Sequence, residues 1–269
     1  MMPQDTFLIP VPPQHLHTLR PWDVTPAHLA YRIGEGGRLL RVGGTAIPRG
    51  GVMYLDHRGF NGMASPERLF RELLQEFRAG ERSGIILDFD RPLPPLQRLT
   101  ALLNDRFQNT NQNLYVTERY AGFAPCARVM IPSALSGGSL LQRLSDACSQ
   151  FGAGRVAVAL DMVAEDFCLP SPSGSGSPLS RDALAQRIDQ LHPSIFFSPE
   201  LCARYFTYMA RDGSAHFVLF DDNDTLQRKA EIARQVGIHA FLLPWPLLER
   251  AAPQLGLARL PTRTQNKRS

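Results

Sequence analysis

The stretch GIILDFDRP, residues 84–92, places two carboxylates at the end of an apolar run. Residues 85–87 are typical of a buried strand, and Pro92 breaks the pattern. Asp88 and Asp90 are two positions apart, so on a strand both side chains face the same side. Paired carboxylates can act as general acid and base when their surroundings keep one protonated and the other ionised.

Other acidic residues follow apolar runs in the same way: Asp56, Asp161, Asp221 and Asp222. Each has a structural alternative, because carboxylates at strand ends also cap the next helix or pair with an arginine. The pair at 88 and 90 is the stronger candidate for chemistry. In a barrel of parallel strands, both side chains would lie inside the mouth, where the strands end and active sites form.

The elements that would position these acids alternate along the chain. Short apolar runs and amphipathic stretches follow one another from about residue 28 to the segment LLPWPLL, as in parallel βα units. Residues 65–80 predict a helix that begins after Ser65, has Pro66 at its first position and ends at Gly80. An opening strand is expected around residues 15–22. About eight strands predict a (β/α)8 TIM barrel of the α/β class, ahead of an open doubly wound sheet.

We expect a single domain, residues 1–269, with its core at about 28–248 and a basic tail at 260–269. In residues 205–222, apolar and polar side chains alternate on both sides of an Asp-Gly turn. This pattern predicts a small β-hairpin inserted before the last βα units. The Pro/Gly/Ser-rich stretch 168–180 is expected to form a long loop within that domain.

Composition narrows the classes of function. The net charge of +4 is spread over interleaved acids and bases and no nucleic-acid-binding motif accompanies it, so we expect no nucleic-acid partner. No segment is long and apolar enough to span a membrane, and no signal peptide is recognisable, which makes the cytoplasm the default location. The four cysteines and seven histidines have no metal-site spacing, and no GxGxxG or P-loop motif opens a helix, so we expect no metal or other cofactor.

GIILDFDRP resembles the signature of glycoside hydrolase family 18, D-G-x-D-x-D-x-E. Residues 205–245 resemble the last third of the same barrels: an aromatic hairpin, a strand ending in acids, a helix with a lysine and a final strand ending near a tryptophan. The resemblance is to the compact bacterial branch of spore-associated and cell-wall-acting members. It implies a TIM barrel that binds or cleaves glycans containing N-acetylglucosamine, and an association with a spore or cell envelope.

The resemblance also carries departures in the signature. Its first acid corresponds to Ser83, its second to Ile86 and its third to Asp88, and its catalytic glutamate corresponds to Asp90. In the family that glutamate protonates the glycosidic oxygen, while the second and third acids orient the N-acetyl group of the substrate. An aspartate reaches less far, and a misplacement of about 1 Å can cost roughly a hundredfold in rate. Ile86 cannot position an acetamido group, so the chain resembles a family member with a degenerate catalytic motif.

Further candidates for glycan binding follow from this resemblance and from residue type. Trp245 comes close to the position where the family has a tryptophan as the floor for a sugar ring. Tyr54 and Tyr205 are candidates to stack on sugars, and Asp161 and Asp222 are acids expected at strand ends near the mouth.

Three hypotheses remain open. The first is a non-catalytic or weakly catalytic binder of an N-acetylglucosamine-type glycan or peptidoglycan fragment. The second is an active glycosidase with Asp90 as general acid, Asp88 as its electrostatic partner, and Asp161, Glu165 or Asp222 as a second carboxylate. The third is a metal-assisted hydrolase that uses the acids of the mouth.

Overall fold

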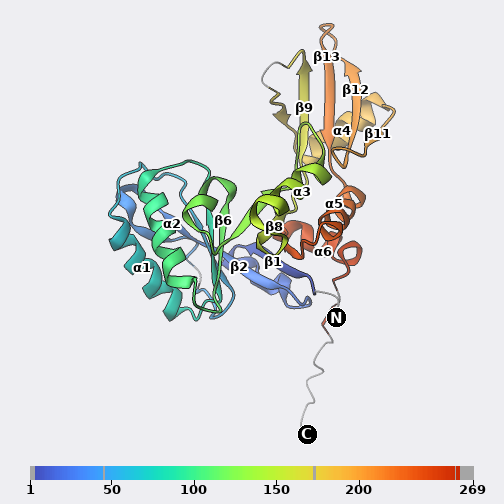
Figure 1. Cartoon of the computed structure of the whole chain (residues 1–269). Helices are drawn as coiled ribbons and strands as arrows, with labels where there is room; N and C mark the ends of the chain where they lie inside the picture. Colours follow the sequence, from blue (N-terminus) through green and yellow to red (C-terminus); the bar gives the residue numbers. More distant parts are fainter. Residues whose placement is uncertain (1–3, 45, 172–173, 258, 261–269) are drawn as a thin grey trace.

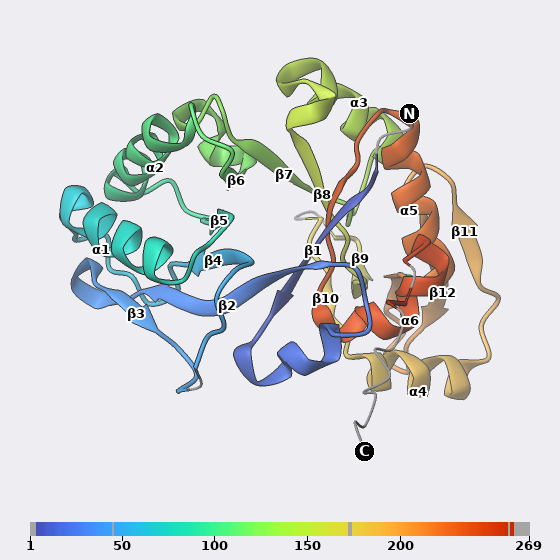
Figure 2. The same ribbon diagram turned by 90° about the horizontal axis from the view of Figure 1, so that it is seen from below.

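A closed ring of eight parallel strands forms the main body of the computed structural model, which describes residues 4–44, 46–171, 174–257 and 259–260 (Figures 1 and 2). β1 pairs with both β2 and β14 and so closes the ring. This confirms the predicted barrel. In order around the ring the strands are β1 (Thr6–Val11), β2 (Thr25–Ile33), β4 (Val52–Asp56), β5 (Gly84–Asp88), β6 (Asn113–Thr117), β7 (Arg128–Pro132), β8 (Val156–Ala159) and β14 (Ala240–Leu242).

Helices cover the outside of the ring unevenly. The α-helices around the barrel are α1 (Pro66–Ala79), α2 (Pro94–Phe107), α3 (Leu140–Phe151), α5 (Asn223–Gln235) and α6 (Trp245–Leu255). The other connections are 3-10 turns, η1 (Pro13–Leu19), η2 (Glu35–Gly37), η3 (Glu118–Phe123) and η4 (Ala153–Arg155), and a short strand β3 (Leu39–Arg41) antiparallel to β2. Within the described ranges, no helix is long and apolar enough to cross a membrane.

The alternation of β5 divides its side chains between two cores. Ile85, Leu87 and Phe89 are fully buried between the strands and the surrounding helices. Ile86 points the other way and packs inside the barrel with residues such as Tyr115. Burying each such side chain contributes roughly 1.5–3 kcal/mol, so the register of β5 is strongly specified. Asp88, on the same face as Ile86, is thereby directed into the mouth.

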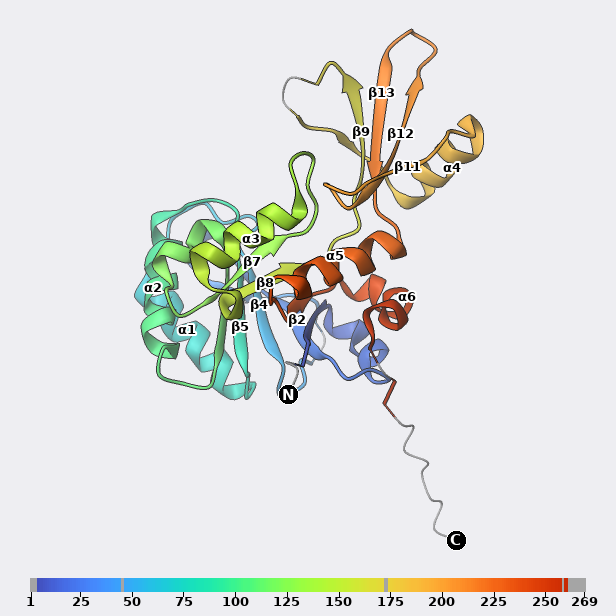
Figure 3. The ribbon, with the colours of Figure 1, turned by 45° about the vertical axis from the view of Figure 1, so that its right-hand side comes forward.

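A second, antiparallel sheet is inserted between β8 and α5 and projects from the barrel (Figures 1 and 3). The predicted hairpin is present as two of its strands, with the turn at Asp212 and Gly213, but the sheet is larger than that hairpin. It contains β10 (Ser177–Pro178), β9 (Ala164–Leu169), β13 (Ala215–Phe220), β12 (Ala203–Met209) and β11 (Phe196–Ser198), in that order, with α4 (Arg181–Leu191) on one side.

Some predicted boundaries differ from the structure. The opening strand lies at Thr6–Val11 rather than 15–22, because the apolar side chains of TFLIPV pair with β14 and β2 while residues 13–19 form a 3-10 turn. The barrel therefore begins well before residue 28. The stretch 168–180 contributes to β9 and β10, and its residues 172–173 lie outside the described residues. The basic tail at 260–269 also lies outside them, except for Leu260.

Candidate functional site

A cavity of about 520 Å³ opens at the carboxyl ends of the barrel strands. Its polar and aromatic lining comes from Tyr54, Asp88, Thr117, Asp161 and Trp245. The rest of the wall is apolar, including Leu29, Met130, Pro132 and Leu242. A mostly apolar cavity with a few convergent polar groups is typical of a binding site for a small organic ligand, and this end of a TIM barrel is where such sites form.

Tyr54 and Asp88 form the polar centre of the cavity. They lie on the neighbouring strands β4 and β5, and the Tyr54 hydroxyl donates a hydrogen bond of 2.9 Å to Oδ2 of Asp88. Burial, followed by the charge of Asp88, raises the pKa of Tyr54, so the phenol remains protonated and continues to donate. Among the described residues Tyr54 is the only side chain hydrogen-bonded to Asp88, which leaves Oδ1 of Asp88 free to accept from a ligand.

Asp161 lies just beyond β8 and adds a second carboxyl group to the cavity wall. Burial raises the pKa of Asp161, and the nearby charges of Asp221 and Asp88 raise it further, while Lys229 acts in the opposite direction. A buried carboxyl group with a raised pKa can donate as well as accept a proton. The cavity thus holds two acids with different surroundings.

Trp245 supplies the aromatic part of the wall. It is the first residue of α6, directly after Pro244, and its indole stacks on the ring of His15 with centroids 4.2 Å apart and planes 11° apart. His15 is part of η1, so the turn after β1 supports the indole. An indole held in this way is a suitable platform for a sugar ring.

Asp90 lies on the rim and does not line the cavity. β5 ends at Asp88, and Phe89 is buried among the residues that pack beneath the helices. The Asp90 side chain, 82% exposed, follows this turn outward and lies beside His57, whose Nε2 is 2.9 Å from Oδ1 of Asp90, and Arg91, whose Nε is 4.0 Å away. Strand alternation places Asp88 in the mouth, but the strand has already ended at position 90.

Two other candidate residues lie in or next to the inserted sheet, away from the mouth cavity. Tyr205 on β12 stacks between Phe217 and Phe196, at centroid distances of 5.3 and 5.5 Å. Asp222 caps α5 by accepting a hydrogen bond of 2.9 Å from the backbone N–H of Thr225, and it also pairs with Arg204. Both side chains have structural partners, and those of Asp222 are the helix cap and the arginine that the structural alternative for strand-end acids predicts.

The acids Asp56 and Asp221 are likewise held by basic partners. Asp56 lies 2.9 Å from Arg32 and 2.7 Å from Arg58. Asp221 and Lys229 form a buried ion pair at 2.7 Å, with both side chains at most 1% exposed. This pairing does not follow from the sequence pattern around either residue. The sequence offers one signal, since Lys229 is one of only two lysines in a chain that otherwise uses arginine.

No group of three or more His, Cys, Asp or Glu side chains in the described part of the chain is arranged to hold a metal ion. The acids of the barrel mouth are therefore not gathered into a ligand set there, and the metal-assisted hypothesis gains no donor geometry from the described residues.

No protein-family model and no curated protein matches the chain. Solved structures do match. The spore cortex-lytic enzyme SleL of Bacillus cereus has a TM-score of 0.65 at 16% identity, over 92% of this chain and 74% of that one. A class V chitinase from Pseudomonas fluorescens Pf-5 has a TM-score of 0.65 at 12% identity, over 92% of this chain and 99% of that one.

Human YKL-39, a pseudo-chitinase with retained chitooligosaccharide binding, has a TM-score of 0.65 at 11% identity, over 94% of this chain and all of that one. At these identities the likeness establishes the fold, which is that of chitinases and chitinase-like proteins. It confirms the fold inferred from the resemblance to glycoside hydrolase family 18.

Proposed function

We propose that the barrel mouth binds a glycan containing N-acetylglucosamine and that the family's hydrolytic route does not operate in it. One observation carries this proposal. The carboxylate at the position of the family's catalytic glutamate, Asp90, is exposed on the rim, whereas Tyr54, Asp88, Asp161 and Trp245 line the cavity. The chain thus has a polar and aromatic cavity suited to a sugar, and the acid in the catalytic position lies outside that cavity.

The similar structures support the kind of ligand. They include a chitinase, a spore cortex-lytic enzyme and a pseudo-chitinase that binds chitooligosaccharides. A cell-wall or spore glycan is therefore the natural candidate, and association with a spore or cell envelope belongs to the same proposal.

Within the site, Asp88 and Trp245 have distinct roles. Oδ1 of Asp88 accepts a hydrogen bond from a sugar hydroxyl or N-acetyl N–H, while Tyr54 holds Oδ2. Trp245 stacks on the apolar face of a sugar ring. Ile86 packs inside the barrel, so the position of the family's second acid has no carboxylate to orient an acetamido group as a nucleophile.

Fluorescence titration with chitotetraose tests this proposal. The chain has two tryptophans, and Trp22 is buried with Arg259 over its ring, so Trp22→Phe leaves Trp245 as the only indole reporter. We expect saturable quenching in that background, a loss of affinity of roughly tenfold in Asp88→Asn, and unchanged affinity in Asp90→Asn. Saturation without turnover of a fluorogenic N-acetylglucosamine oligomer supports the binder. No saturation in the Trp22→Phe protein would overturn it.

An active glycosidase is the second candidate, because Asp88 and Asp161 face one cavity with different surroundings. Asp161, whose pKa burial raises, would be the acid in that reading, and Asp88 the second carboxylate. The version with Asp90 as general acid makes a different prediction. Turnover that is abolished by Asp161→Asn favours Asp161 as the acid with Asp88 as the second carboxylate. Turnover that is abolished only by Asp90→Asn favours Asp90 as the general acid.

A further inference from the structure

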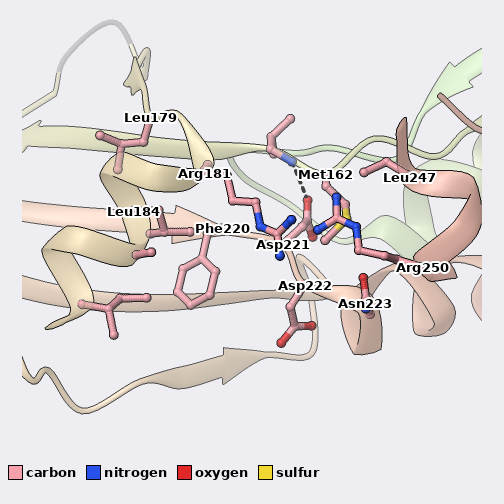
Figure 4. Close-up of a pocket in the computed structure, with 14 residues that line it drawn as sticks. Met162, Leu179, Arg181, Leu184, Phe220, Asp221, Asp222, Asn223, Leu247 and Arg250 are labelled. Carbon is pink, nitrogen blue, oxygen red and sulfur yellow. Dashed lines mark hydrogen bonds between the residues drawn. The ribbon is translucent and has the colours of Figure 1, made fainter. Parts of the chain in front are cut away.

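A second pocket, of about 390 Å³, lies where the inserted sheet meets the barrel (Figure 4). α4 forms one wall and the start of α6 forms another. Apolar side chains cover much of it, among them Met162, Leu184, Phe220 and Leu247. Its polar residues are Arg181, Asp221, Asp222, Asn223 and Arg250. The pocket therefore combines an apolar surface with charged groups of both signs.

The two acids in this pocket are already neutralised. Asp221 is held by Lys229 through both oxygens, at 2.7 and 2.8 Å, and it also accepts hydrogen bonds from the Thr225 hydroxyl and the backbone N–H of Val163. Asp222 pairs with Arg204 and caps α5, as described above. Neither acid requires a further cation.

The two arginines are in the opposite situation. Arg181 comes from α4 and Arg250 from α6, and Figure 4 shows both guanidinium groups pointing into the same part of the pocket, near Asp221. Neither guanidinium has a hydrogen bond or ion pair to any residue that the structure describes. Two converging cations beside apolar side chains offer up to ten N–H donors without an anionic acceptor, counting five for each guanidinium.

This pocket and the cavity of the barrel mouth are lined in part by residues that are neighbours in the sequence. Asp161 lines the mouth and its neighbour Met162 lines the pocket, and Pro246 and Leu247 are divided in the same way. Two chain segments thus separate the cavities, and both cavities open at the carboxyl end of the barrel. We take these two adjacent cavities as the binding places of one ligand.

We propose that Arg181 and Arg250 bind the carboxylate of an acidic substituent carried by the glycan in the mouth, with the apolar stem of that substituent against Leu184 and Phe220. Guanidinium groups pair with carboxylates through parallel hydrogen bonds, and the apolar side chains beside them offer a surface for the stem of the substituent. The inference rests on the proposed function and selects within it a ligand that is not neutral: a sugar bearing a short peptide or similar carboxylate-ended branch.

The test compares three probes by isothermal titration calorimetry: chitotetraose, an N-acetylglucosaminyl-N-acetylmuramyl dipeptide, and the same dipeptide with its carboxylates amidated. Wild-type protein should bind the acidic probe more tightly than the amidated one. Arg181→Gln and Arg250→Gln should each weaken the acidic probe roughly five- to tenfold, with less than a twofold effect on the other two. Arg78→Gln, which removes an exposed arginine from the last turn of α1, is the matched control and should change none of them.

Equal affinities for the acidic and amidated probes, or unchanged affinity for the acidic probe in both variants, would overturn the inference. A sugar-free probe, N-acetyl-leucine, separates this failure from that of the proposed function. Weak binding of N-acetyl-leucine that Arg181→Gln removes, together with no binding of chitotetraose, would support the arginine pocket and reject the glycan site. Chitotetraose binding without any preference for the acidic probe would support the glycan site and reject the binding of a carboxylate by Arg181 and Arg250.

Discussion

Asp88 in the barrel mouth and Asp166 in the inserted sheet have one feature in common and otherwise differ. Each accepts a hydrogen bond of 2.9 Å from a tyrosine hydroxyl, Tyr54 in the first case and Tyr208 in the second. Asp166 has two further partners, His216 at 2.8 Å and the guanidinium of Arg187. Among the described residues, Asp88 has no further hydrogen bond and faces a cavity.

The difference distinguishes structural acids from acids available to a ligand. Burial alone would raise the pKa of Asp166, but hydrogen bonds from His216 and Tyr208, with the charges of His216 and Arg187, hold it below its ordinary value. The same carboxylate raises the pKa of Tyr208 to about 12, after the larger effect of burial. An ionised carboxylate has about four acceptor positions, so the unused ones on Asp88 are the chemically informative ones.

The largest effect is expected where a fully paired acid loses its partner. Lys229→Met leaves Asp221 buried with an uncompensated charge, and we expect the free energy of unfolding in urea to fall by about 3–5 kcal/mol. The double variant Lys229→Met/Asp221→Asn should recover part of that loss. A single variant as stable as the wild type would mean that the pair contributes nothing to holding the fold.

A smaller loss is expected at Asp166. Asp166→Asn weakens the bonds from His216, Tyr208 and Arg187 and should lower the free energy of unfolding at pH 7 by about 1–3 kcal/mol. Because the pKa of Asp166 is lowered in the folded protein, its contribution is present above the ordinary Asp pKa of about 4 and is lost as the pH falls through the folded-state value. Asp189→Asn, on the exposed side of α4, is the control.

Asp88→Asn should affect ligand affinity more than stability, unlike Asp166→Asn. Only one hydrogen bond to a neighbouring side chain is affected, so we expect a change in unfolding free energy of less than about 1 kcal/mol, with the roughly tenfold loss in chitotetraose affinity given above. A stability loss as large as that of Asp166→Asn, measured in the same urea series, would remove the distinction between the two acids.

The smallest effect concerns Asp161. Its raised pKa means that ionisation disfavours the folded state, so stability falls as the pH rises from the unfolded-state pKa through the folded-state pKa. Asp161→Asn removes this penalty and should raise the melting temperature at pH 7 but not at pH 3. An equal rise at both pH values would point to packing rather than charge as the cause.

Local signals in the sequence accounted for much of the fold. Ser65, Pro66 and Gly80 correctly bound α1, because caps and proline act within one turn. The Asp-Gly turn at residues 212–213 correctly predicted β12 and β13. Three other strands of the inserted sheet were not predicted: β10 and β11 are only two and three residues long and depend on pairing with distant strands, and the longer β9 was missed as well.

The site itself depended on contacts that no local pattern contains. Asp161 and Asp222 both follow apolar runs, yet one lines the mouth and the other caps a helix, and only the tertiary arrangement distinguishes them. Asp88 and Asp90 are two positions apart, as residues on one face of a strand would be. However, β5 ends at Asp88, Phe89 is buried, and Asp90 lies on the rim. Arg181 and Arg250 are distant in sequence and meet only because the insertion folds back against α6.

The hydrogen bonds between Val163 and Asp221 also define a graft point. The backbone N–H of Asp221 donates to the carbonyl of Val163 at 2.8 Å, and the backbone N–H of Val163 donates to the Asp221 carboxylate at 3.2 Å. The chain therefore leaves the barrel and returns to it at adjacent positions, and residues 164–220 form an excursion that a short linker could replace without stretching the ring. A barrel shortened in this way would retain Asp88, Trp245 and Arg250 and lose Arg181. The contribution of Arg250 to the second pocket could then be measured without that of Arg181.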